Sequence, residues 1–401
     1  MIDAGTVIAR LRETDARSGG RREAWTEVWA AEREQLDALA RAATDDVLIE
    51  RDAFANSWYV LPGETEEIVL VSSHSDCVPG GGWLDGILGA HAAIGVLESV
   101  ARDRLGSGAR PRRTLAVADW ADEEGTRFGR SLLGSSAATG ALSAAELDAL
   151  TASDGTPARG IVAAHGFDAD ALGRRSERLA HVVAALELHI EQGSSLERER
   201  RAVAAVSGCL GVRRSRIEFD GVAGHAGSTP MQLRADPVRA AAAFVQELFA
   251  FAQERSGLAT VGRIEAQPAF ITAVPARCVL DLDLRHAELA GLEEISDRAD
   301  ELLEHAEPCT AQRRHVYAQD PVGFDPELVA AAARAAGADP PVRSGPLHDT
   351  AALAQAGIPA AMLFTSSIAG VSHARAEDTP EPDLAVAIEA LERLVRSLLD
   401  G

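Results

Sequence analysis

The chain of 401 residues contains no lysine, so all 39 of its basic residues are arginine. This absence excludes a Schiff-base lysine, a P-loop lysine and a carboxylated lysine that bridges two metal ions. Cysteine is scarce, and the four cysteines lie far apart, at Cys77, Cys209, Cys278 and Cys309. That spacing argues against a disulfide framework and against a cysteine-based zinc site.

Positive charge is also in deficit, because the formal net charge is -22. Nucleic acids and anionic membranes both require a basic surface, so neither is an expected partner. No apolar run approaches the roughly 20 residues of a membrane span. The first residues lack the pattern of a signal peptide, and the cytoplasm is therefore the expected location. The composition, 46% hydrophobic and 25% charged, is that of a soluble globular protein, and the length favours two domains.

Short apolar runs predict buried strands at 68–73, 114–121, 181–190 and 360–367. Helical spacing of apolar residues predicts helices at about 22–42, 90–105 and 383–399. Strands that alternate with helices indicate an α/β fold with a mainly parallel sheet. In such sheets ligands bind beyond the carboxyl ends of the strands.

The pattern changes between about 207 and 319. Apolar and polar residues alternate in 213–227 and 276–286, which predicts half-exposed antiparallel strands on either side of a helix over 236–254. We therefore expect a catalytic domain over 1–206 and 320–401, with an α+β domain over 207–319 inserted into it.

Residues of the types that bind metals follow the predicted strands. His74 follows the first strand, and a nearby carboxylate such as Asp76 can fix the tautomer of a metal-binding imidazole. Asp85, in the turn "WLDG", could present a carboxylate to two ions. A single histidine of this kind is more often structural than a ligand, so the position of His74 after a buried strand matters.

The second strand ends in "ADEEG", which places Glu123 and Glu124 side by side. One glutamate can bind a metal while the other acts as a general base. An acidic run is otherwise typical of a solvated loop, but this run follows a buried strand. His189 and His373 come at the ends of the third and fourth strands. The four strand ends together favour a metal site.

Seven segments carry a family resemblance in order along the chain: "HSDCVPGGGWLDG", "DEEGTRFG", "LELHIEQG", "GVAGHAGSTPMQLRADP", "VPARCVLDLDLRH", "SGPLHD" and "GVSHARAEDT". Together they resemble the signatures of the amidase/hydantoinase/carbamoylase branch of the M20 metallopeptidase clan. That branch includes N-carbamoyl-L-amino-acid hydrolases, β-ureidopropionases and allantoate amidohydrolases. "LELHIEQG" favours this branch over the carboxypeptidase-like ones.

The resemblance implies a hydrolase domain with two divalent metal ions, zinc by preference and otherwise manganese, cobalt or nickel. The implied ligands of one ion are His74, Asp85 and His189, and those of the other are Asp85, Glu124 and His373. Glu123 would be the general base, and Asp76 would orient His74.

The resemblance also implies substrate contacts. Gln192 matches a residue near the substrate, and Arg285 matches an arginine that clamps the substrate carboxylate, although sequence alone favours a solvated arginine there. His225, in the inserted domain, would reach into the site of a partner subunit and stabilise the oxyanion. The inserted domain is thus expected to act as a lid and as the dimerisation domain of a homodimer.

Some residues depart from the family pattern. Thr272 stands where the family has a substrate-contacting asparagine, Pro346 and Leu347 replace Ala-Gly near the substrate, and Cys77 replaces a threonine. The implied metal ligands and base are intact. We therefore expect metal-dependent hydrolysis of a linear, non-peptide C–N bond in a small molecule that bears a carboxylate, such as an N-carbamoyl amino acid or an allantoate-like compound. Alternatives are an N-acyl amino acid amidase or dipeptidase and a non-catalytic metal-binding homologue.

Overall fold

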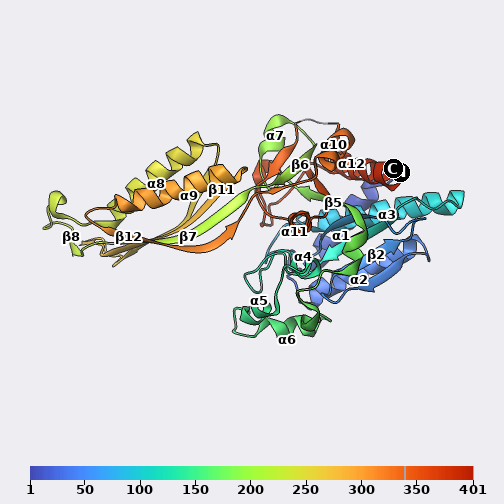
Figure 1. Cartoon of the computed structure of the whole chain (residues 1–401), viewed down its shortest axis with the longest axis horizontal. Coiled ribbons are helices and arrows are strands. Elements are labelled where there is room, and N and C mark those ends of the chain that lie inside the picture. Colours follow the sequence, from blue (N-terminus) through green and yellow to red (C-terminus); the bar gives the residue numbers. More distant parts are fainter. Residues whose placement is uncertain (338–339, 401) are drawn as a thin grey trace. The chain divides into compact units, whose positions relative to one another are not determined.

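The structure is a computed structural model that describes residues 1–337 and 340–400. The chain divides into two compact units, one of Met1–Gly208 with Gly323–Gly401 and one of Cys209–Val322 (Figure 1). The sequence analysis expects this division at 207 and 319. Among the described residues, no helix is long and apolar enough to span a membrane, and all four cysteines are buried and free.

The first unit contains a sheet of nine strands within the described residues. Eight of them follow one path, in the order β1 (Leu48–Arg51), β2 (Ser57–Leu61), β4 (Thr114–Trp120), β3 (Ile68–His74), β5 (Val182–Ile190), β15 (Ala360–Thr365), β6 (Val203–Cys209) and β13 (Val322–Gly323), and β14 (Val342–Ser344) pairs with β6. The neighbours β4–β3, β3–β5 and β5–β15 are parallel. The pairs β1–β2, β2–β4 and β15–β6 are antiparallel. The predicted α/β fold with a mostly parallel central sheet is confirmed.

The central strands are buried along almost their whole length, which explains their continuous apolar runs. The helices of this unit are α1 (Ala4–Ser18), α2 (Glu27–Ala43), α3 (Ile87–Ser107), α4 (Leu133–Thr139), α5 (Ala144–Ala149), α6 (Ala158–Ala163), α7 (Ser195–Glu199), α10 (Pro326–Ala336), α11 (Asp349–Gln355) and α12 (Glu381–Leu399). Helices α3 and α12 pack on β3 and β5, and α11 packs on β3, β5 and β15.

The predicted helix over 22–42 is wrong in its start. Helix α2 begins at Glu27, because the Thr26 hydroxyl accepts the Trp29 backbone N–H at 3.3 Å and caps the helix there. Helix α1, which the sequence analysis does not predict, ends at Gly19 in the left-handed conformation. Residues 19–26 form an irregular segment between the two helices.

The second unit has a four-stranded antiparallel sheet in the order β12 (Thr310–Gln319), β7 (Gly211–Asp220), β11 (Arg277–His286) and β9 (Leu258–Gln267). Helices α8 (Pro237–Glu254) and α9 (Leu289–Glu304) pack on this sheet and close a core of its own. The short strands β8 (Gly224–His225) and β10 (Ala273–Val274) form a separate pair. The pair lies at the end of this sheet where β7 ends and β11 begins, and Figure 1 shows β8 there.

Candidate metal centre and active site

The carboxyl ends of four neighbouring strands carry the predicted ligands. His74 is the last residue of β3, and Glu124 follows β4. His189 is the penultimate residue of β5, and His373 lies a few residues beyond β15. Because these strands are adjacent and parallel, their carboxyl ends lie along one edge of the sheet. The tertiary structure thus brings together side chains that are far apart in sequence.

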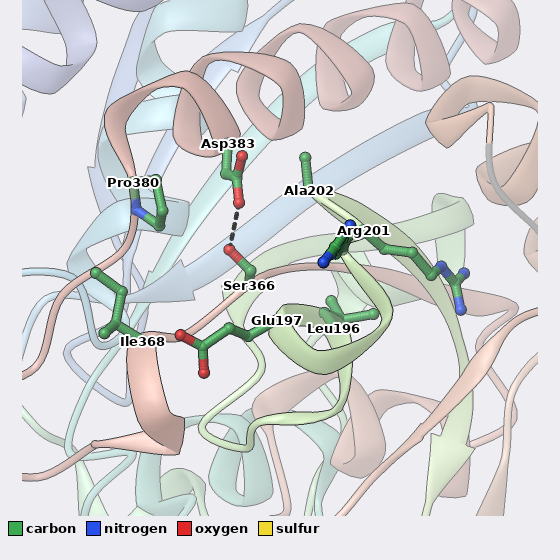
Figure 2. A pocket seen from close by; sticks show the side chains of 9 residues that line it. Leu196, Glu197, Arg201, Ala202, Ser366, Ile368, Pro380 and Asp383 are labelled. Carbon is green, nitrogen blue, oxygen red and sulfur yellow. Dashed lines mark hydrogen bonds between the residues drawn. The ribbon is translucent and has the colours of Figure 1, made fainter.

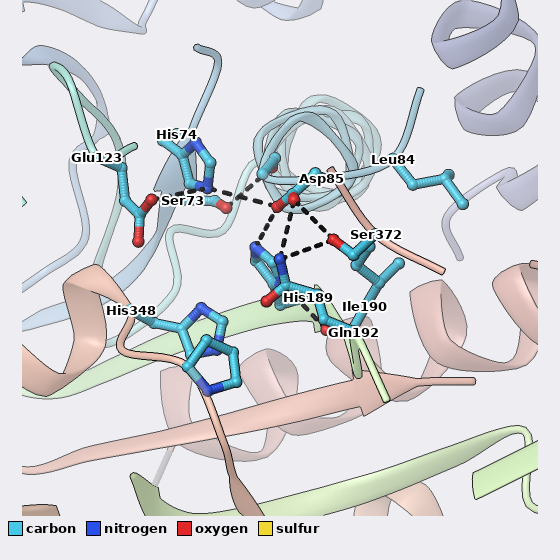
Figure 3. A network of polar contacts seen from close by, with 12 residues as sticks. Ser73, His74, Leu84, Asp85, Glu123, His189, Ile190, Gln192, His348 and Ser372 are labelled. Carbon is cyan, nitrogen blue, oxygen red and sulfur yellow. Dashed lines mark hydrogen bonds and ion pairs between the residues drawn. The ribbon is translucent and has the colours of Figure 1, made fainter. Parts of the chain in front are cut away.

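Asp85 lies at the centre of these side chains, in the turn before α3 (Figure 3). Its Oδ1 atom is 3.2 Å from His189 Nε2 and 4.0 Å from His74 Nε2. Its Oδ2 atom is 3.3 Å from His373 Nε2, which in turn is 3.4 Å from Glu124 Oε2. Two groups with metal-binding geometry therefore share the one carboxylate, His74–Asp85–His189 and Asp85–Glu124–His373.

The two buried histidines present the same nitrogen to Asp85. Nδ1 of His74 is 3.2 Å from the backbone oxygen of Asp76, and Nδ1 of His189 is 3.0 Å from that of Ile190. When these Nδ1 atoms donate to the carbonyls, each Nε2 carries a lone pair for a metal ion. Both Nε2 atoms and Oε1 of Glu124 are buried without a hydrogen-bond partner. Such orphaned atoms are costly unless a ligand satisfies them, so this donor set fits divalent ions.

The Asp76 carboxylate lies between His74 and the turn that carries the two glutamates. Its Oδ1 is 3.4 Å from His74 Nδ1. It also accepts the backbone N–H of Glu123 at 3.3 Å on Oδ1 and that of Glu124 at 3.2 Å on Oδ2. Asp76 therefore contacts both the imidazole and the acidic turn, whereas the sequence analysis predicts only the first contact.

Negative charge is concentrated at this edge of the sheet. Burial raises the pKa of Glu123 well above its ordinary value, and the nearby Asp349 and Glu124 carboxylates add to the rise. Burial and the Asp85 carboxylate raise the pKa of Glu124 to about 7. Burial acts in the same direction on Asp85, but the close imidazoles of His189 and His373 outweigh it and hold the pKa of Asp85 well below its ordinary value. A site in which carboxylates repel each other in this way favours bound cations.

Glu123, the predicted base, lies beside the first group of ligands. Its Oε2 atom is 3.7 Å from His74 Nε2, and its side chain is 10% exposed. Gln192 lies on the other side of the cluster and donates from Nε2 to Asp85 Oδ2 at 2.9 Å and to Ser372 at 3.0 Å (Figure 3). Its Oε1 atom is buried and has no hydrogen-bond partner, so it can still accept a hydrogen bond.

Three of the predicted substrate residues belong to the second unit. His225 is exposed and pairs with Ala273 across β8 and β10, and the backbone oxygen of Thr272 accepts a hydrogen bond from Ala226 N at 2.9 Å. Arg285 lies near the opposite end of β11, where it donates to both carboxylate oxygens of Asp283, at 2.7 and 3.2 Å. The structure thus places His225 beside Thr272 and separates both from Arg285.

The remaining departures from the family pattern lie close to the cluster. Leu347 and Pro346 are half-buried and directly precede His348. Cys77 is buried, and its sulfur accepts the backbone N–H of Arg22 at 3.3 Å. Burial raises the pKa of this thiol, so the structure gives no sign of a reactive thiolate.

Sequence reasoning missed two buried groups beside the predicted ligands. The ring of His348 lies 4.4 Å from that of His189, and Oε1 of Glu377 accepts the backbone N–H groups of Leu84 and Asp85 at 3.0 and 3.1 Å. Both residues lie in segments that carry the family resemblance, "SGPLHD" and "AEDT", which is the signal that could have identified them.

Glu187, His189 and His348 form a third group with metal-binding geometry. However, Oε2 of Glu187 already accepts hydrogen bonds from the hydroxyl and the backbone N–H of Thr350, at 2.6 and 3.3 Å. This carboxylate has protein partners, unlike the orphaned atoms around Asp85, so the two groups that share Asp85 are the better metal sites.

A hollow of about 270 Å³ lies elsewhere in the first unit (Figure 2). Its lining residues are Leu196, Glu197, Arg200, Arg201, Ala202, Ser366, Ile368, Pro380 and Asp383. Ser366 donates to Asp383 at 2.6 Å across its wall. Its charged residues are of both signs, and it contains none of the predicted site residues.

Comparisons with known proteins show the family and the fold of the chain. Residues 70–397 match the model of the peptidase family M20/M25/M40. The N-carbamoyl-L-amino-acid amidohydrolase of Paenarthrobacter aurescens is 32% identical over 93% of this chain and 92% of its own length. The allantoate amidohydrolase of Bacillus subtilis is 31% identical over 83% of this chain and 81% of its own length. A solved amidase of the hydantoinase/carbamoylase family from Burkholderia multivorans superposes with a TM-score of 0.91 at 26% identity, covering 100% of this chain and 98% of that one.

Proposed function

Since the chain belongs to peptidase family M20/M25/M40 and is a hydrolase, we propose that it cleaves a linear, non-peptide C–N bond of a small molecule that bears a carboxylate. The observation that carries this proposal is the shared position of Asp85 between two groups of metal-binding side chains. A carboxylate that contacts two such groups is the arrangement that a dinuclear hydrolase needs.

His74, Asp85 and His189 would hold one divalent ion, and Asp85, Glu124 and His373 would hold the other. Imidazole and carboxylate ligands suit zinc, and manganese, cobalt and nickel are the alternatives. When bound, such ions polarise the scissile carbonyl and lower the pKa of a water molecule.

Glu123 is the proposed general base. Its raised pKa makes the carboxylate more basic than an ordinary glutamate, which suits a group that takes a proton from water and passes it to the leaving nitrogen. Asp76 contacts both the backbone N–H of Glu123 and the ring of His74. It would therefore fix the position of the base relative to one ligand. Gln192, with its free Oε1, would accept a hydrogen bond from the substrate.

We propose that the second unit supplies the remaining contacts as a lid and dimerisation domain. Arg285 would bind the substrate carboxylate through its planar guanidinium, and Asp283 already orients that group. His225 would stabilise the oxyanion of the tetrahedral intermediate, a contact typically worth about 3 kcal/mol.

The positions of His225 and Arg285 support a contribution from a second subunit. His225 lies beyond the end of β11 that begins at Arg277. Arg285 lies eight positions further along this strand. At a rise of about 3.3 Å per residue, that span exceeds roughly 25 Å, far longer than a small substrate. One substrate therefore does not contact both residues of the same chain, and His225 would act in the site of the partner in a homodimer.

A mixing experiment tests the shared site. Inactive His225→Ala and Glu123→Gln variants, when mixed and allowed to exchange subunits, should regain part of the activity, because one site of the mixed dimer has both residues intact. Activity that stays absent in verified mixed dimers would contradict the contribution in trans.

The proposed substrate class is ureido acids, that is, N-carbamoyl amino acids or allantoate-like compounds, on which the named relatives act. Ammonia and amine release should be measured on N-carbamoyl, N-formyl and N-acetyl amino acids and on allantoate, with zinc-loaded and manganese-loaded enzyme. Ammonia from ureido compounds alone supports the proposal. Amine release from acyl compounds without ammonia would instead indicate that the substitution at Thr272 accompanies a different amide specificity.

Glu123→Gln tests the chemistry itself. The variant should bind metal as the wild type does and lose nearly all turnover, since glutamine cannot accept the proton. Turnover close to that of the wild type would refute Glu123 as the base.

A further inference from the structure

A tryptophan from the segment between α1 and α2 contacts the turn that carries the proposed base. Trp25 is buried, and its indole Nε1 donates to Asp122 Oδ2 at 2.6 Å, across 97 residues of sequence. Asp122 directly precedes Glu123. The segment that holds Trp25 lies outside the part of the chain that matches the family model, residues 70–397.

The turn at Asp122 has an uncommon conformation that requires support. Asp122 has φ +58°, in the left-handed region that residues other than glycine rarely adopt. Its carboxylate accepts Trp25 Nε1 on one oxygen and the backbone N–H of Gly125 at 3.2 Å on the other. Left-handed residues persist only where their surroundings hold them, and here the side chain of Asp122 joins the turn to Trp25.

The backbone of the turn is held on its other sides. Asp76 accepts the N–H groups of Glu123 and Glu124, and the backbone oxygens of Asp122 and Glu123 accept N–H groups from Leu133 and Leu132, at 3.1 and 2.7 Å. These contacts support the backbone at residues 122–124 and do not involve the Asp122 side chain. The Asp122 side chain is the remaining element of the turn, and its orientation depends on the indole.

Trp25 is itself held in place. Its φ is +65°, which is a strained value for a bulky residue. Its backbone oxygen accepts a hydrogen bond from Arg127 Nη1 at 2.8 Å. Its ring packs edge-on against Trp29 at 5.2 Å and against Phe167 at 6.3 Å. An aromatic ring with an N–H donor suits this place, because an apolar cluster surrounds the ring and a buried carboxylate faces its edge.

We propose that Trp25 is a positioning residue for Glu123, acting through the hydrogen bond from its indole to Asp122. This inference rests on the proposed role of Glu123 as the general base. Loss of the indole N–H leaves a buried Asp122 oxygen without a partner, and the turn then relaxes from its left-handed conformation. A base displaced by about 1 Å costs on the order of 10²-fold in rate.

Trp25→Phe removes the donor and keeps an aromatic ring. Trp29→Phe is a matched control, since Trp29 is equally buried in the same cluster but its Nε1 has no hydrogen-bond partner. For Trp25→Phe we expect kcat on the preferred substrate to fall about 10- to 100-fold, with KM and the bound metal within about threefold of the wild type. For Trp29→Phe all three quantities should stay within about threefold.

Equal losses in the two variants would overturn the proposal, and so would loss of bound metal in Trp25→Phe, because either result indicates a merely structural role. If Trp25→Phe does not fold, Asp122→Asn decides by the same criteria, since the amide cannot accept both hydrogen bonds that the carboxylate accepts. A crystal structure gives a readout independent of turnover: in the variant, φ of Asp122 and the Glu123 carboxylate should shift, and an unchanged turn refutes the proposal.

Glu123→Gln, assayed in parallel, separates this inference from the proposed function. Activity of the Glu123→Gln variant close to that of the wild type would refute both Glu123 as the base and the positioning role of Trp25. If Glu123→Gln is inactive and Trp25→Phe behaves as Trp29→Phe does, only the positioning role of Trp25 is refuted.

Discussion

Gly86 is the position at which a single methyl group should disable the metal centre. It lies between Asp85 and α3 with φ +66°. The backbone N–H of Ile87 donates a hydrogen bond to the backbone oxygen of Asp85 at 2.7 Å, which closes a γ-turn. A Cβ atom at residue 86 would lie 2.2 Å from His74 Cε1 and 2.4 Å from each ring nitrogen. Ordinary van der Waals contact begins at about 3.4 Å, so in Gly86→Ala the imidazole must move by about 1 Å.

His74 has no room for that movement, because its ring is buried and stacks on His189 at 5.8 Å. Metal–ligand distances tolerate only about 0.2 Å, so a shift of about 1 Å removes the ligand. We expect Gly86→Ala to weaken zinc binding by about 10²-fold or more. Loss of a residue that only supports a metal ligand already lowers metal affinity by about 10- to 100-fold. The assay is isothermal titration calorimetry of the chelator-stripped protein with zinc, together with the metal content of the purified variant.

Gly80→Ala is the matched control. Gly80 also has a positive φ, of +70°, but a Cβ atom there meets nothing within 4 Å. Alanine at this position carries the backbone strain without the clash, so zinc affinity should stay within about threefold of the wild type. Zinc affinity of Gly86→Ala equal to that of Gly80→Ala would refute the reasoning, because it would mean that the His74 ring yields or does not bind the ion.

Three further predictions concern stability. Arg33→Met leaves Asp119, 2.8 Å from the guanidinium, as a buried carboxylate without its cation, so the free energy of unfolding in urea should fall by about 3–5 kcal/mol; a loss under about 1 kcal/mol would contradict this. Burial raises the pKa of Glu32, but hydrogen bonds from His91, Arg17 and Thr14 outweigh burial and leave that pKa below its ordinary value. The stabilisation is therefore present above pH about 4.5 and is lost as the pH falls through the folded-state pKa. In urea, the wild type should have a higher free energy of unfolding than Glu32→Gln at about pH 7, and this difference should shrink as the pH falls. A difference that grows towards acid pH would contradict the prediction. Removal of metal with a chelator should lower the melting temperature, and zinc at about 100 times its Kd should restore about 2.7 kcal/mol, whereas a melting temperature that does not respond to metal would count against the site.

Much of the proposed metal centre can be derived from the sequence, because its candidate ligands lie at strand ends. A run such as Ile68–Val71 is apolar throughout only where both faces of a strand are covered, and His74, at the end of the same buried strand, lies at the edge of the sheet. That pattern predicted His74, His189, His373 and the pair Glu123 and Glu124 as candidate site residues. The family resemblance added the division of these residues between two ions.

Helix starts were less predictable. The apolar spacing over 22–42 continues through Trp25, but the Thr26 cap, which depends on a single hydroxyl, starts α2 at Glu27. Hydrophobic periodicity reports which face of a segment is buried, and it does not report where the first backbone N–H groups find their acceptors.

The sequence by itself determined the alternation of the four central strands with helices, the residue types that follow each of these strands and the acidic balance of the chain. Only the tertiary structure decided that Asp85 lies between two groups of candidate ligands, that Nε2 of His74 and of His189 faces it, that Glu377 accepts a hydrogen bond from its backbone, and that the indole of Trp25 donates to Asp122. The physical reason is range. Alternating burial and capping act between residues a few positions apart, whereas the contacts that join Glu377 to the Asp85 backbone and Trp25 to Asp122 link segments about a hundred or more residues apart and form only when the sheet and its helices pack.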